Sequence, residues 1–126
     1  TATFDRSRPD RAAARSAAGQ SRLKEVREAL EARRRWITPR QAKLLTGKHS
    51  AQRMGERGLS VQWRYDDGRL LGLELNLGSE PLQVEPQHLG PVEAQLVFAH
   101  RWPQDTPRGT WPPFAARWTL GEEITL

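Results

Sequence analysis

The strongest constraint on the fold is an alternation of apolar and polar residues in two runs, 59–65 and 71–77. Apolar side chains occupy every second position on both sides of the turn sequence Asp66-Asp67-Gly68. They are Leu59, Val61, Trp63, Tyr65, Leu71, Leu73, Leu75 and Leu77. A period of two places such side chains on one face of a strand, and Asp-Gly is a frequent hairpin turn. The sequence therefore predicts an antiparallel β-hairpin with one buried face.

Three shorter apolar stretches follow the hairpin. We expect strands at residues 82–85, 94–99 and 114–120, separated by proline-rich loops. Proline cannot donate a hydrogen bond to a sheet, so its positions mark the ends of strands. Five or six short strands at this spacing are typical of a small antiparallel sandwich.

The N-terminal part of the chain has a different composition. Residues 1–57 carry 15 Lys and Arg against 6 Asp and Glu, whereas residues 58–126 carry 5 against 9. Residues 1–20 contain little apolar surface, which predicts an extended or disordered segment unless a partner covers it.

Two helices are expected after this segment. The first begins near Ser21 and carries one apolar stripe. The stripe consists of Leu23, Val26, Leu30 and Ile37. The sequence Thr38-Pro39-Arg40-Gln41 predicts a second, short helix that includes Leu44 and Leu45 and ends at Gly47. Helices with one narrow stripe cannot close a core alone, so we expect them to lie on another surface.

These patterns predict an α+β chain. Amphipathic helices would occupy residues 1–50, and an all-β antiparallel sandwich would occupy residues 51–126. No apolar run is long enough to cross a bilayer, and the sequence has no cysteine, which is consistent with a cytoplasmic location.

No complete active site is expected, because the chain contains no known nucleophile, phosphate-binding or metal-ligand motif. His49, His88 and His100 are far apart in the sequence and are interpreted as solvated or structural side chains. We therefore assign no catalytic residue, no metal ligand and no cofactor.

Two clusters of residues are candidates for a binding site. Arg33, Arg34 and Arg35 could neutralise phosphates, but the aromatic residues that would stack on bases lie elsewhere, so nucleic acid is disfavoured as a partner. Trp102 and Trp111 could form an exposed aromatic platform for a sugar ring. The alternative is that both tryptophans seal the edge of the sandwich or a joint with a neighbouring domain.

Several segments resemble the C-terminal end of the malto-oligosyltrehalose trehalohydrolase branch of the α-amylase superfamily (glycoside hydrolase family 13). The segments run from about residue 3 to 120. They are Thr3 to Asp10, Leu30 to Leu45, Trp63-Arg64-Tyr65-Asp66-Asp67-Gly68-Arg69, Leu73-Glu74-Leu75-Asn76-Leu77-Gly78, and Pro112 to Leu120. Pro9 departs from the leucine that is usual in the first segment.

The resemblance implies a non-catalytic C-terminal part of an enzyme that releases trehalose from maltooligosyl trehalose. Its partner would be the catalytic barrel of the same parent chain, and it could also contact α-glucan. No position matches the family's catalytic aspartate and glutamate. There are two alternatives. One is a free-standing carbohydrate-binding sandwich, and the other is the C-terminal domain of a related branching or debranching enzyme.

Overall fold

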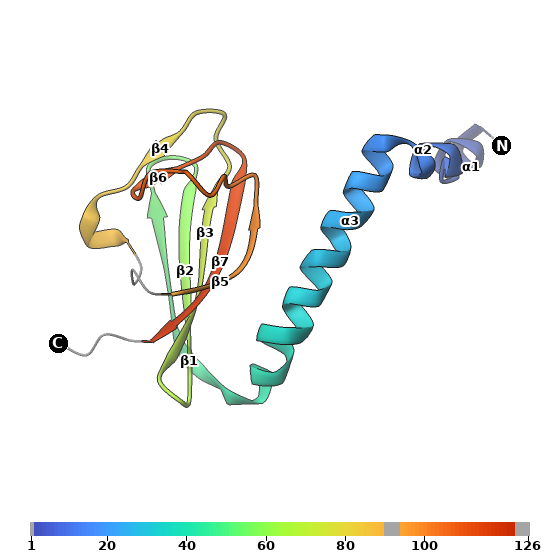
Figure 1. Ribbon diagram of the computed structural model, residues 1–126. Coiled ribbons are helices and arrows are strands. Elements are labelled where there is room, and N and C mark those ends of the chain that lie inside the picture. Colours follow the sequence, from blue (N-terminus) through green and yellow to red (C-terminus); the bar gives the residue numbers. More distant parts are fainter. Residues whose placement is uncertain (1, 90–93, 123–126) are drawn as a thin grey trace. The chain divides into compact units, whose positions relative to one another are not determined.

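The computed structural model describes residues 2–89 and 94–122 of the chain (Figure 1). These residues belong to two compact units, Thr1–Glu31 and Ala32–Leu126, and each unit is described by itself. The first unit is helical, and the second contains all the described strands.

The N-terminal unit is helical almost from its start, so the prediction of an extended segment over residues 1–20 was wrong. Its helices are α1 (Ala2–Ser7), α2 (Arg11–Arg15) and α3 (Ala17–Ala32), which continues to the start of the second unit. In α2 and at the start of α3 the cause is the alanine content, because alanine has the highest helix propensity. Asp10 adds an N-cap to α2, and its Oδ1 accepts hydrogen bonds from the amides of Ala12 at 2.9 Å and Ala13 at 3.3 Å.

The second, short helix predicted from Thr38 is present, but it ends at Lys43 and does not include Leu44 and Leu45. The chain forms a π-helical turn over Arg33–Ile37 (η1) and a 3-10 turn over Thr38–Lys43 (η2), and strand β1 (Leu44–Met54) begins at once. Leu44 and Leu45 therefore lie in a strand. Pro39 lies in the first turn of this 3-10 segment, where a missing amide hydrogen costs no helical hydrogen bond.

The predicted hairpin is confirmed. Strands β2 (Gly58–Tyr65) and β3 (Arg69–Asn76) pair antiparallel, with Val61 opposite Leu73. In the turn, Gly68 has a φ of +83°, and the amide of Arg69 donates to Asp67 Oδ1 at 3.0 Å.

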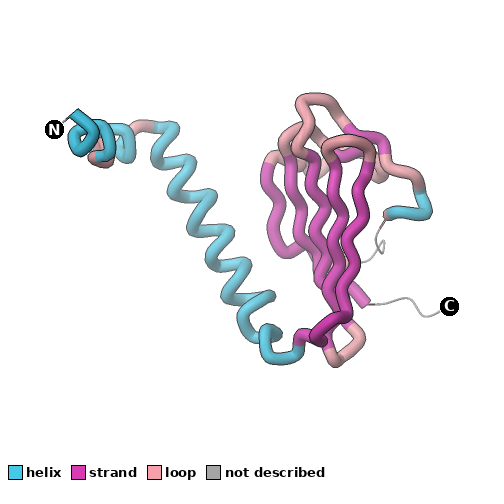
Figure 2. Tube along the Cα trace, turned by 180° about the vertical axis from the view of Figure 1, so that it is seen from behind, coloured by secondary structure: helices cyan, strands magenta, loops and turns pink. Residues whose placement is uncertain are grey.

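The other described strands complete two sheets. The larger sheet has the order β1-β2-β3-β7-β5, with all neighbours antiparallel, and Figure 2 shows its five strands side by side. Its later strands are β5 (Gln95–His100) and β7 (Ala115–Glu122), and the smaller sheet pairs β4 (Leu82–Gln83) with β6 (Thr110–Trp111). A 3-10 turn, η3 (Pro86–His88), follows β4. The α+β prediction, with helices before a small sandwich-like β unit, is confirmed.

The five-stranded sheet has one apolar and one polar face, because residues paired across strands share a face. The apolar face includes Val61, Trp63, Leu71, Leu73, Trp118 and Leu120, and the polar face includes Ser60, Gln62, Glu74, Arg117 and Thr119. At one end of the apolar face, Ala32, Trp36 and Ile37 cover a core cluster. The cluster consists of Tyr65, Leu71, Val97 and Leu120.

A second core cluster joins the two sheets. It contains Met54, Val84 and Trp111, with Leu82, Leu89 and Trp102 packed against it. Met54 pairs with Gly58, and Gly58 pairs with Asn76, which lies two residues after Glu74 in β3. Met54 therefore lies on the polar face. The smaller sheet therefore covers one end of the polar face, and the rest of that face is available for a site.

Candidate functional site

The two tryptophans predicted to contact carbohydrate occupy different environments. Trp111 lies in β6 and is only 1% exposed, so neither face of its ring is open to a ligand. Trp102 lies in the loop after β5 and is partly exposed. The ring centroids are 6.2 Å apart with planes inclined by 53°, so Trp111 supports Trp102 from the core side.

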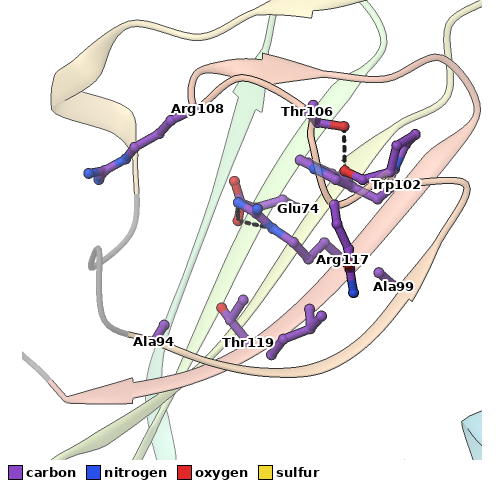
Figure 3. A pocket seen from close by; sticks show the side chains of 11 residues that line it. Glu74, Ala94, Ala99, Trp102, Thr106, Arg108, Arg117 and Thr119 are labelled. Carbon is purple, nitrogen blue, oxygen red and sulfur yellow. Dashed lines mark hydrogen bonds and ion pairs between the residues drawn. The ribbon is translucent and has the colours of Figure 1, made fainter.

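A pocket of about 350 Å³ lies next to Trp102, over the polar face of the larger sheet (Figure 3). Strands β3, β7 and β5 supply its floor, and the loop from Trp102 to Arg108 supplies its walls. The floor residues are Glu74, Arg117, Thr119, Leu96 and Ala99, and the wall includes Trp102, Pro103, Gln104, Thr106 and Arg108. Every second residue of a strand faces the same side, and a register shift between Leu96 and Phe98 puts Leu96 and Ala99 on the same face of β5.

An ion pair lies at the centre of the pocket floor. Glu74 and Arg117 are direct neighbours across β3 and β7, and Glu74 Oε1 accepts from Arg117 Nη2 at 2.7 Å and from Nε at 3.2 Å. The guanidinium carbon of Arg117 also lies 4.3 Å from the centroid of the Trp102 ring. The carboxylate and the indole therefore hold this guanidinium from two sides.

The ion pair leaves one oxygen of the carboxylate without a donor. Glu74 is 8% exposed, and its Oε2 is buried with no hydrogen-bond partner among the residues that the structure describes. A forked Arg–carboxylate pair would use both oxygens, whereas here both donors point to Oε1. Oε2 is thus an acceptor whose hydrogen-bonding capacity the protein does not use.

The wall of the pocket is ordered by hydrogen bonds within the loop. Thr106 Oγ1 donates to the carbonyl of Pro103 at 2.6 Å, and the amide of Thr106 donates to the same carbonyl at 3.1 Å. Arg101, at the start of the loop, has a φ of +53°, which is uncommon for a residue with a side chain. This conformation turns the chain at the end of β5, just before Trp102.

Sequence reasoning did not identify Glu74, Arg117 or Thr119 as site residues. The alternation of strand residues placed them on the polar side, which was the only available signal. Their convergence depends on the register between β3 and β7, whose paired residues Glu74 and Arg117 are 43 positions apart.

Among the remaining candidates, His49 lines a separate pocket of about 310 Å³ together with Lys48 and Gln62. His88 Nδ1 lies 3.2 Å from Gln52 Nε2, and the guanidinium of Arg35 lies 4.8 Å from the Trp36 ring. Within residues 2–89 and 94–122, no three His, Asp or Glu side chains are grouped so that they could hold a metal ion. None of the helices in these ranges is long and apolar enough to span a bilayer.

The sequence was compared with known proteins. A search of curated proteins finds no match. Residues 49–121, from within β1 to the end of the sheet in β7, match the family described as "Domain of unknown function (DUF3459)". This domain is found at the C-terminus of α-amylase-family glycoside hydrolases. The match covers more than half of the 126 residues, and the chain therefore belongs to the DUF3459 family.

Proposed function

We propose that this chain is the non-catalytic C-terminal part of a cytoplasmic glycosidase that releases trehalose from maltooligosyl trehalose. The parent enzyme would cleave the α-1,4 glucosidic bond next to the trehalose end. The observation that carries the proposal is the family match over residues 49–121, which includes the hairpin sequence Trp63 to Arg69. The motifs outside the matched range, from Thr3 to Asp10 and from Leu30 to Leu45, support the trehalohydrolase branch.

The partner in this proposal is the catalytic barrel of the same parent chain. The apolar stripe of α3 is suited to such a partner, since Leu23, Val26 and Leu30 are each between 40% and 44% exposed. Burying each of them in a barrel would contribute about 1 kcal/mol or more. In the proposal, α3 completes the last helical layer of the barrel, and the strands from β1 onward follow as the C-terminal β domain.

An activity assay tests the proposal. Expressed together with the coding sequence upstream of Thr1, the chain is expected to be part of an enzyme that releases trehalose from maltooligosyl trehalose. The 126-residue chain alone is expected to release none. Glucan hydrolysis or transfer without trehalose would assign the domain to a related branching or debranching enzyme, and trehalose release by the short chain alone would refute a non-catalytic role.

The partner is tested separately in that longer protein. Val26→Lys places a charge on the apolar stripe and is expected to lower the thermal unfolding midpoint by several degrees, about 2–4 °C per kcal/mol. The matched control is Glu31→Lys, which introduces the same side chain at an exposed position off the stripe. Equal midpoints for the two variants would show that the stripe has no partner.

The second candidate function is a free-standing carbohydrate-binding module. The pocket beside Trp102 favours it, because this pocket does not depend on any catalytic domain. A chain that binds saccharides but has no catalytic sequence upstream would support this alternative.

A further inference from the structure

The pocket beside Trp102 combines polar and apolar groups in one place. A guanidinium held in place by a buried carboxylate lies beside an indole and a threonine hydroxyl in a pocket of about 350 Å³. We infer that this pocket binds a neutral, polyhydroxylated ligand, chemically a short saccharide.

The charges on the pocket floor disfavour a charged ligand. An anion would meet the carboxylate of Glu74, and the charge of Arg117 is already matched by that carboxylate. An organic cation would meet the guanidinium of Arg117. Arg108 on the wall would attract an anion, and the titration with inorganic phosphate described below tests that alternative. A neutral ligand with hydroxyl groups avoids both penalties, since each hydroxyl can donate and accept.

Hydroxyl groups also fit the hydrogen-bonding groups on the pocket floor. Arg117 uses Nε and Nη2 for Glu74, so its Nη1 is available to donate to a ligand oxygen. The Thr119 hydroxyl lies on the same floor. Glu74 Oε2 is covered by protein atoms, so the carboxylate contributes by holding the guanidinium of Arg117 in place.

The apolar groups of the pocket match the C–H surface of a sugar ring. Trp102 stands at the wall, with Pro103 beside it, and Leu96 and Ala99 lie on the floor. Because Arg117 and Trp111 both contact the Trp102 ring, the indole is already oriented before a ligand binds. A volume of about 350 Å³ is at the lower end of the range for ligand pockets, about 300–1,000 Å³, which favours a short saccharide.

The identity of the sugar rests on the proposed function, which implies α-1,4-linked glucose. The experiment is a calorimetric titration of the 126-residue chain with maltotriose, cellotriose and inorganic phosphate. Concentrations up to about 20 mM cover the millimolar affinities expected for so few contacts. We expect saturable binding of maltotriose and none of phosphate.

Two variants locate the binding. Thr119→Val removes one hydroxyl at nearly constant volume and is expected to weaken maltotriose binding about three- to tenfold. Its matched control is Thr46→Val, the same change at an exposed position of β1 outside the pocket, which should leave the affinity unchanged. Glu74→Gln removes the charge that holds Arg117 in place and is expected to weaken binding about tenfold. Thermal unfolding of each variant shows whether it is folded.

The results distinguish a failure of the saccharide site from a failure of the proposed function. Binding of cellotriose but not maltotriose, with the same loss in Thr119→Val, would support the saccharide site and contradict the glucan assignment. The inference is overturned if neither trisaccharide binds, if phosphate binds more tightly than both, or if Thr119→Val and Thr46→Val bind equally well.

Discussion

Asn76 is a buried polar side chain that connects two parts of the β unit. It is 2% exposed at the end of β3, and its Nδ2 lies 3.0–3.1 Å from the carbonyl oxygens of Glu80, Trp111 and Pro112. Its Oδ1 accepts from the amide of Gly78 at 2.9 Å. The side chain therefore ties the larger sheet to β6, which contains Trp111, and this tie indirectly supports Trp102.

We expect Asn76→Ala to lower the free energy of unfolding by about 2–4 kcal/mol, because several buried backbone groups lose their partner. Asn76→Asp should cost more, since its carboxylate would face carbonyl oxygens. Urea denaturation measures both effects. Gln87→Ala, at an exposed position, serves as the control and should stay within about 0.5 kcal/mol. An aspartate variant as stable as the original chain would contradict this account.

Tyr65 gives the β unit a dependence on alkaline pH. Burial raises the pKa of the Tyr65 hydroxyl above its ordinary value of 10.0, while Arg40 opposes and Asp67 adds to the rise. The folded state therefore holds this proton more tightly than the unfolded state. The resulting stability is fully present below the ordinary pKa and is lost as the pH rises through the folded value.

Tyr65→Phe should remove this dependence. Unfolding free energies at about pH 9 and pH 11 should fall less with pH in Tyr65→Phe than in the original chain. Measuring both proteins in the same buffers cancels the titration of the other groups. Identical pH slopes would show that the hydroxyl does not titrate differently in the folded chain.

At the scale of elements, the hairpin was predictable because its information is local. Two alternating runs and a turn sequence determine β2, β3 and their register. β1 was missed because its residues are exposed from Leu44 to Arg53 and therefore do not alternate in hydrophobicity. The pocket was missed for a related reason, since it depends on pairing between distant strands.

The turn of this hairpin depends on Gly68. An added Cβ would find no atom within 4 Å, so any cost of substitution arises from its φ of +83° and not from a clash. We expect Gly68→Ala to destabilise the chain by about 1 kcal/mol. Gly68→Asn should cost less, because asparagine tolerates the left-handed region better. Chemical denaturation of both variants tests this order, and equal losses would contradict it.

For the whole molecule, the compact unit begins before its first strand. Trp36 and Ile37 cover the core around Tyr65 and Leu71, although they precede β1. A chain of residues 32–126 should therefore keep a cooperative unfolding transition. A chain of residues 44–126 lacks this cover and should be less stable by about 2–4 kcal/mol, in line with the cost of emptying part of a core. Equal stability of the two truncated chains would show that the cover contributes nothing.

The position of β1 at the border of the sheet also affects behaviour in concentrated solution. Unpaired backbone groups on an outer strand can recruit strands from other molecules and start aggregation. β1 carries Lys48 and Arg53, and Gly47, with a φ of +76°, lies where its register shifts. Two copies aligned along this strand would bring like charges together. The exposed polar and charged residues that make β1 hard to recognise in the sequence thus also protect the chain from β-pairing with other molecules.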